Sequence, residues 1–193
     1  DSIVAAATPI GESAIAVIRV SGTLCQELCK DALRVPYPTP RRSILAGYRD
    51  IEECLIDDVI FVFYEEQNSY TGEPSLEISS HGNPLITKKI IEDLVARGCR
   101  LAEPGEYTKR AFLSGRMDLT QAESVATLIK ASSDRALEVA RIQLRGDLGK
   151  KIRDLQSRLL DLQANLEAYI DFPEEDLPSE NMKGPSSTLG NLI

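Results

Sequence analysis

The sequence predicts an α+β protein, in which a mixed-sheet α/β domain is followed by an all-α helical domain. The first 118 residues alternate β-type runs with helical patterns, and glycine and proline punctuate them. From Asp118 to Pro173 those two residues almost disappear, and apolar residues recur at helical spacing. We therefore expect an α/β domain at residues 1–118, the first part of a helical domain at residues 119–178, and a tail at residues 179–193.

Four apolar runs in the first domain predict strands. Residues 14–20 follow a Thr-Pro-Ile-Gly breaker at residues 8–11, and they read as a buried strand that carries Arg19 near its end. The second and third candidates are residues 44–48 and 58–64, the latter rich in valine, isoleucine and aromatic residues. A short fourth strand is expected at residues 75–80.

Two helices are predicted in the same domain. Apolar residues at helical spacing run from Leu24 to Leu33, and Pro36 prevents the pattern from continuing. The second helix begins with Pro84 and ends before Gly98, which is the usual placing of these two residues at helix ends.

The helical domain is expected to open at Thr120 and Glu123, which have the spacing of a capping box. Residues 132–134 predict a break between two helices. An apolar stripe with heptad-like spacing follows, and its members are Leu144, Leu148, Ile152, Leu155, Leu159, Leu162, Leu166 and Tyr169. A stripe this narrow has to pack on another helix, so partner helices are expected from a further C-terminal part or from a second chain.

The composition excludes several classes of protein. A content of 42% hydrophobic and 27% charged residues in 193 is typical of a soluble globular protein. A net charge of −8 repels a phosphate backbone, so any nucleic-acid contact has to be local or supplied by a partner. No apolar run is long enough for a membrane span, and no secretory segment opens the chain. Because the four cysteines form no ligand cluster, we expect reduced thiols in a cytoplasmic protein, with Cys25 and Cys29 as small apolar residues on one helix face.

Residues 69–123 hold the best candidates for a ligand site, because a carboxylate-bearing strand, a helix, a Pro-Gly turn and an Arg-bearing loop follow one another closely. Strand alternation directs Leu76 and Ile78 to one side and Glu77 to the other. Glu77 is then either a ligand-binding carboxylate or an ordinary solvent-facing glutamate. Arg19 lies among apolar residues, so it either binds a ligand or pairs with an acidic neighbour.

Other polar residues are given structural roles. His81, the only histidine, stands in no recognisable triad spacing, so we expect a structural role rather than general-base chemistry. Gly72 and Gly82 are expected to serve turn geometry or close backbone approach. The acidic run at residues 171–176 reads as a solvated loop rather than a metal site. Three further charged residues are candidates for an ion-pair network near the site, although charged residues near turns are mostly just solvated. They are Glu73, Glu106 and Arg110.

A series of motifs runs in order along the chain. They are IVAAATP at residues 3–9, IAVIRVSG at 15–22, SYTGE at 69–73, LEI at 76–78, HG at 81–82, PGEYTKRAFL at 104–113, GRMDLTQAE at 115–123 and YIDFP at 169–173. In this order they resemble the N-terminal portion of the MnmE (TrmE) family of bacterial tRNA-modification GTPases, and the resemblance extends to about Pro178.

This resemblance implies a folate-binding, dimerising domain, similar in fold to the tetrahydrofolate-binding aminomethyltransferase of glycine cleavage. It also implies a helical domain into which the family inserts a GTPase domain. Such proteins form homodimers and act with the flavoprotein MnmG on the wobble uridine of tRNA, at C5 of position 34. The implied one-carbon donor is 5-formyltetrahydrofolate or 5,10-methylenetetrahydrofolate, while GTP, Mg and K would be bound only by the GTPase domain.

The resemblance also assigns three cofactor-binding residues. Glu77 matches the position that contacts the pterin, whose ring N–H and amino group one carboxylate can accept together. Arg19 and Arg116 match the family's two basic positions, which suit the anionic glutamyl tail. Arg116 departs from the lysine that the family commonly has, and the two side chains donate with different geometry. No catalytic or metal-binding residue is predicted.

The sequence contains no GxxxxGK[ST] loop, so we expect this chain alone not to bind or hydrolyse GTP. The family's C-terminal cysteine motif is also not present. Two other readings remain open from the residues. One is a stand-alone folate-dependent protein related to the aminomethyltransferase, for which 193 residues are too few. The other is a non-enzymatic helical dimerisation module.

Overall fold

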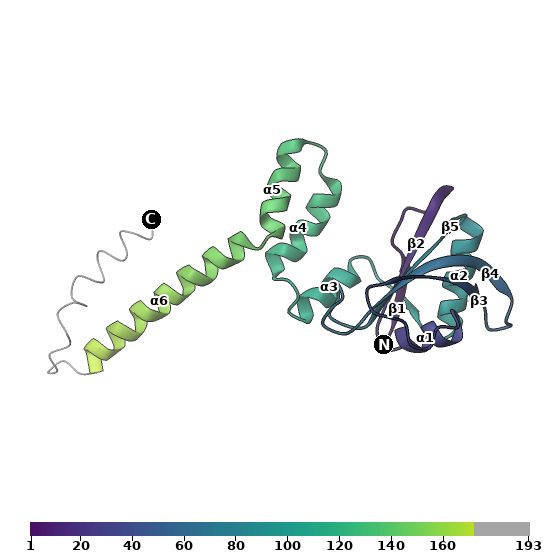
Figure 1. The fold of residues 1–193 in the computed structure, drawn as a ribbon. Coiled ribbons are helices and arrows are strands. Elements are labelled where there is room, and N and C mark those ends of the chain that lie inside the picture. The colour runs from purple at the N-terminus through teal and green to yellow at the C-terminus, as the bar shows by residue number, and fades with distance from the viewer. Residues whose placement is uncertain (172–193) are drawn as a thin grey trace. The chain divides into compact units, whose positions relative to one another are not determined.

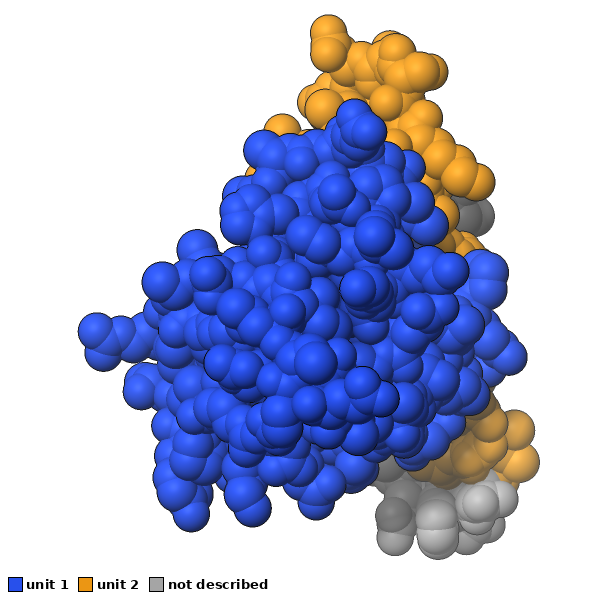
Figure 2. Space-filling view, turned by 90° about the vertical axis from the view of Figure 1, so that its right-hand side faces the viewer, with its two compact units in different colours: residues 1–122 blue, residues 123–193 orange. Residues whose placement is uncertain are grey.

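The computed structural model describes residues 1–171 (Figure 1), so the tail and most of the acidic run at residues 171–176 lie outside the described residues. Contacts between Cα atoms divide the chain into two compact units, Asp1–Ala122 and a second that begins at Glu123 (Figure 2).

The first unit is built on a six-stranded mixed sheet with the order β3-β4-β5-β2-β1-β6. Strands β1 and β6 pair in parallel, and every other neighbouring pair is antiparallel. The bounds are β1 Ile3–Ala6, β2 Ser13–Ser21, β3 Ser43–Arg49, β4 Leu55–Tyr64, β5 Ser75–Gly82 and β6 Arg100–Leu101. The mixed sheet is as predicted, and the four expected strands are confirmed as β2 to β5. Strands β1 and β6 were not predicted.

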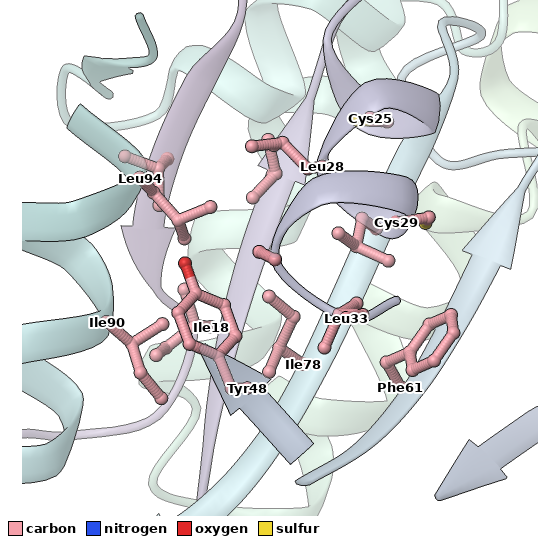
Figure 3. Close-up of a cluster of buried hydrophobic side chains, with 14 of the residues drawn as sticks. Ile18, Cys25, Leu28, Cys29, Leu33, Tyr48, Phe61, Ile78, Ile90 and Leu94 are labelled. Carbon is pink, nitrogen blue, oxygen red and sulfur yellow. The ribbon is translucent and has the colours of Figure 1, made fainter. Parts of the chain in front are cut away.

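Two helices, α1 (Cys25–Asp31) and α2 (Pro84–Ala96), supply the other side of the core. Ile18 of β2 and Ile78 of β5 pack in one buried cluster with Leu28 of α1, as Figure 3 shows. Cys25 and Cys29 are fully buried in this cluster, as expected of apolar residues. Burial raises the pKa of the Cys29 thiol to about 12, so the thiol stays protonated at neutral pH.

Helix α2 has the ends that the sequence predicts. Pro84 occupies the first turn, and the side chain of Asn83 accepts a hydrogen bond from the backbone N–H of Leu85 at 2.8 Å. Gly98 follows the helix with φ at +104°, a conformation that residues with a Cβ rarely adopt.

The segment after β6 was expected to be a Pro-Gly turn and an Arg-bearing loop, but most of it is helix α3 (Glu106–Leu113). Gly105 precedes the helix in a left-handed conformation, with φ at +77°. Arg116 does lie in the turn after α3. The PGEYTKRAFL motif is therefore a helix with its N-terminal turn.

The helical region comprises α4 (Leu119–Lys130), α5 (Asp134–Leu144) and α6 (Asp147–Asp171). The predicted break at residues 132–134 is confirmed, because Ser133 caps α5 by accepting from the backbone N–H of Ala136 at 3.3 Å. Within residues 1–171, no helix combines the length and apolar content that a membrane span requires.

Two predictions about these helices are wrong. The capping box is Asp118 and Gln121, not Thr120 and Glu123: Asp118 Oδ1 accepts from the backbone N–H of Gln121 at 3.0 Å, and Gln121 Oε1 accepts from that of Asp118 at 2.9 Å. The apolar stripe is also not continuous, because α5 ends at Leu144 and Gly146 takes a φ of +78° before α6 begins. The apolar residues that belong to α6 are largely exposed, for example Leu159 at 55%.

Candidate ligand-binding site

The site is centred on an ion pair between two central strands. Arg19 of β2 and Glu77 of β5 are cross-strand partners in the antiparallel ladder, so their side chains leave the sheet on the same face. Their neighbours Ile18 and Ile78 point into the core, and the pair therefore faces away from it. Glu77 Oε1 accepts from Arg19 Nε at 2.9 Å and from Arg19 Nη2 at 2.6 Å. The two side chains are half-buried, at 32% and 28% exposure.

Three tyrosines surround this ion pair. The hydroxyl of Tyr64 donates to Glu77 Oε2 at 3.3 Å. Burial and then the adjacent Glu77 carboxylate raise the pKa of Tyr64, so its hydroxyl keeps its proton for donation. The guanidinium carbon of Arg19 lies 5.7 Å from the ring centre of Tyr70 and 5.9 Å from that of Tyr107. Tyr107 OH also donates to the backbone carbonyl of Arg19 at 2.6 Å.

The ion pair forms part of the wall of a pocket of about 310 Å³, which is near the lower end of the range for small-molecule sites. All three residues predicted from the sequence, Arg19, Glu77 and Arg116, line this pocket. The other lining residues are Arg41, Tyr64, Asn68, Ser69, Tyr70, Thr71 and Ser75. With three arginines and one glutamate, the pocket carries positive charge in a chain whose net charge is −8. This arrangement suits a ligand that has an anionic part and a hydrogen-bond donor for Glu77.

Gly72 is required by the turn that forms one side of the pocket. Its φ is +82°, and an added Cβ would lie 2.8 Å from Ser114 Oγ and 3.3 Å from Arg116 Cγ. Ser114 Oγ also donates to the carbonyl of Thr71 at 2.6 Å, which fixes this turn against the segment that carries Arg116. The role expected for Gly72 is confirmed. Gly82 is confirmed as a close-approach position, since its Cβ would lie 2.2 Å from the carbonyl oxygen of Ser13.

The candidate ion-pair network is formed, and it lies next to the pocket. Arg110 Nη1 donates to Glu73 Oε2 at 2.9 Å, and Arg110 Nη2 donates to Glu106 Oε1 at 3.1 Å. Ser21 joins this network to the pocket wall, because its hydroxyl contacts both Glu73 Oε2 (3.0 Å) and Thr71 Oγ1 (2.7 Å). The network therefore supports the site without lining it.

His81 is exposed and lies at the end of β5, where it is tied to the neighbouring strand. Its Nδ1 is 2.8 Å from Asp57 Oδ1, and its backbone N–H donates to Asp57 Oδ2 at 2.8 Å. These contacts join β5 to β4, in keeping with the structural role expected. In the part of the chain that the structure describes, no group of three or more His, Cys, Asp or Glu side chains could hold a metal ion.

Comparison with known families separates the chain into the same two kinds of region. The family described as "GTP-binding protein TrmE N-terminus" matches residues 2–116, and the one described as "MnmE helical domain" matches residues 119–193. The chain belongs to the MnmE (TrmE) family.

Relatives in this family are similar over nearly the whole chain. A tRNA modification GTPase MnmE from Opitutus terrae is 51% identical over 181 residues, which are 94% of this chain and 40% of that protein. The proteins of the same name from Aquifex aeolicus and Akkermansia muciniphila are 47% and 43% identical over 93% and 99% of this chain. The chain spans only 40% and 43% of their lengths, respectively.

The MnmE motifs identified in the sequence thus include the three predicted site residues, but other lining residues, among them Tyr64 and Arg41, were not predicted from the sequence. Tyr64 lies at the end of β4, and a signal for it existed, because strand alternation places it on the face opposite the buried Phe61 and Phe63. Arg41 lies in the turn before β3, in a proline-rich linker without periodicity, where the sequence carries no comparable signal.

Proposed function

We propose that this chain is the N-terminal part of a tRNA-modification GTPase and that its pocket binds a tetrahydrofolate one-carbon donor. The modification would take place at C5 of the wobble uridine, position 34. The observation that carries this proposal is the convergence of Arg19, Glu77 and Arg116 on one pocket of positive charge. The names of the relatives support the role in tRNA modification.

The residues present fit a reduced folate. Glu77 offers a carboxylate to the adjacent N–H and amino donors of the pterin, and Tyr64 together with Arg19 fixes its orientation. Arg116 supplies positive charge for the carboxylates of the glutamyl tail, to which the resemblance also assigns Arg19. The bound 5-formyl or 5,10-methylene derivative supplies the one-carbon unit. Within this function GTP, Mg and K belong to a GTPase domain, because this sequence contains no GxxxxGK[ST] loop.

The proposal includes assembly as a homodimer in the cytoplasm, with an MnmG-type flavoprotein as partner and tRNA as substrate of the complex. The exposed apolar residues of α6 support an association of helices, since isolated helices gain most of their stability from packing. Light scattering should give twice the chain mass of 21.2 kDa at micromolar concentration. A monomer across that range would contradict dimerisation without bearing on the folate site.

Titration calorimetry with 5-formyltetrahydrofolate tests the site. We expect the chain to bind it and Glu77→Ala to lose roughly 100-fold or more in affinity, because charge-assisted hydrogen bonds from two donors are removed. Glu92→Ala is the matched control, since Glu92 is an exposed glutamate on α2 that does not line the pocket. Equal affinity of the wild type and Glu77→Ala would remove Glu77 from the site.

A further inference from the structure

The three arginines of the pocket differ in what already holds them. We infer that Arg19 acts as a positioning residue through Glu77, and that the anionic tail of the ligand is recognised by Arg41 together with Arg116. This inference rests on the proposed folate function. It changes the role expected for Arg19, and it assigns a binding role to Arg41, which no sequence motif suggested.

Arg19 is held in place on several sides. Two of its donor groups, Nε and Nη2, are directed at the same carboxylate oxygen of Glu77. The rings of Tyr70 and Tyr107 both lie within 6 Å of its guanidinium carbon, at 5.7 and 5.9 Å. A guanidinium fixed in this way cannot follow a flexible tail without breaking the ion pair. For a ligand, the consequence is that Arg19 fixes the orientation of Glu77. The second carboxylate oxygen of Glu77, Oε2, accepts a hydrogen bond from the Tyr64 hydroxyl at 3.3 Å.

Arg41 and Arg116 are different, because both are exposed and line the same pocket. Within residues 1–171, no carboxylate lies within 4.0 Å of either guanidinium. Their charge is therefore not neutralised by an ion pair of the described chain. A folate tail carries two carboxylates in its terminal glutamate, and two unpaired guanidiniums match that number.

One loop holds both of these arginines at the pocket. Arg41 Nη2 donates to the backbone carbonyl of Asn68 at 3.0 Å, at the start of the loop. At its other end, Gly72 packs so closely on the stem of Arg116 that an added Cβ would lie 3.3 Å from Arg116 Cγ. Residues 68–72 thus contact both Arg41 and Arg116, whereas Arg19 and Glu77 are held as cross-strand partners in the sheet.

The test compares two ligands that differ only in the tail. Calorimetry on the 193-residue chain would measure the affinity of 5-formyltetrahydrofolate and of 5-formyltetrahydropteroylamide, in which a neutral amide replaces the glutamate. The variants are Arg19→Gln, Arg41→Gln and Arg116→Gln. Arg42→Gln is the matched control, because Arg42 is the exposed neighbour of Arg41 and does not line the pocket. Circular dichroism of each variant checks that the fold is retained.

We expect Arg41→Gln and Arg116→Gln each to lower the affinity for the complete folate about 10-fold. The affinity for the ligand without the glutamate should change less than about 2-fold. Arg19→Gln should lower the affinity for both ligands by the same factor, about 10-fold or more, because Arg19 acts on the pterin end through Glu77. Arg42→Gln should change neither.

Two outcomes would overturn the inference. One is an Arg41→Gln effect that is absent or equal for both ligands, since an equal loss would mean a disturbed loop rather than a lost tail contact. The other is an Arg19→Gln effect confined to the complete folate. Failure of the proposed function is a separate result, in which the wild-type chain binds neither ligand.

Discussion

The stability of the first unit should depend strongly on one buried carboxylate, that of Asp93 in α2. Its side chain is only 5% exposed and accepts from three directions. Tyr48 OH donates to Oδ2 at 2.7 Å, Arg97 Nε donates to Oδ2 at 2.7 Å, and the backbone N–H of Ile51 donates to Oδ1 at 2.9 Å. Asp93 therefore joins α2 to β3 and to the turn that follows it.

The expected cost of Asp93→Ala follows from these partners. The substitution leaves the hydroxyl of the fully buried Tyr48 without its acceptor and breaks an ion pair in which Arg97 is 14% exposed. Removing one member of a buried pair costs about 3–5 kcal/mol in the free energy of unfolding. Tyr48→Phe removes one hydrogen bond and leaves Asp93 its other two donors, so it should cost only about 1 kcal/mol. Glu92→Ala, at an exposed neighbour in the same helix, should stay within about 0.5 kcal/mol.

Urea denaturation followed by tyrosine fluorescence measures these differences. The chain has no tryptophan, and five of its six tyrosines lie in residues 1–122, so the signal reports mainly on the first unit. The expected order of destabilisation is Asp93→Ala, then Tyr48→Phe, then Glu92→Ala. A loss below about 1 kcal/mol for Asp93→Ala would refute the reasoning, because such a value is typical of an exposed ion pair rather than a buried one.

Three further predictions concern pH, packing and thiol chemistry. Hydrogen bonds from Arg100 lower the pKa of Glu106 to about 2, so its stabilising contribution is complete above its ordinary value of 4.5 and is lost as the pH falls toward 2; Glu106→Gln should flatten the melting temperature between pH 5 and 2.5. Gly82→Ala should destabilise by about 1–3 kcal/mol in urea denaturation, whereas Gly11→Ala, with nothing within 4 Å of the added Cβ, should not; equal effects would contradict the packing argument. Cys54 is the exposed cysteine of the four, so a thiol reagent should label one thiol in the native chain and four in denaturant; rapid labelling of a second thiol would contradict the burial of the others.

Much of the fold could be predicted because its main elements carry local signals. Strand β2 is a run of apolar residues between breakers, and α2 has proline at its start and glycine after its end. Strands β1 and β6 have only 4 and 2 residues, too few for a periodic pattern, and they exist because neighbouring strands pair with them. Such short segments are determined by tertiary contacts, which a local pattern does not contain.

The misplaced helix boundaries have a different cause. Thr120 and Asp118 are both capable N-caps, and the choice of Asp118 depends on the return hydrogen bond that Gln121 Oε1 accepts from the backbone N–H of Asp118. Gly146 interrupts a stripe whose spacing continues across it, because residues 144 and 148 keep helical spacing even though the helix between them is broken. Helix α3 was missed because Pro104 and Gly105 read as a turn, and they are in fact the turn from which the helix begins.

Resemblance and strand alternation together predicted that Glu77 leaves the sheet on the side opposite Leu76 and Ile78, and the structure has it so. They could not predict that Arg19 and Glu77 face each other, because that depends on the register between strands 58 residues apart. The register between β2 and β5 places Arg19 and Glu77, two separate candidates in the sequence, opposite each other as an ion pair. The sequence left two roles open for Arg19, ligand binding and pairing with an acidic neighbour. Arg19 does pair with an acidic neighbour, and that neighbour, Glu77, is itself a candidate site residue.

Arg19 both lines the pocket and pairs with Glu77, and this affects how the pocket would discriminate between ligands. An anion without hydrogen-bond donors would be attracted by Arg41 and Arg116 but repelled by Glu77, whose carboxylate remains in the pocket wall. A neutral pterin would satisfy Glu77 and leave the two exposed arginines to water. Under the proposed function, a ligand with both a donor edge and an anionic tail would meet all four charged residues, and the site would therefore select for the combination rather than for either part.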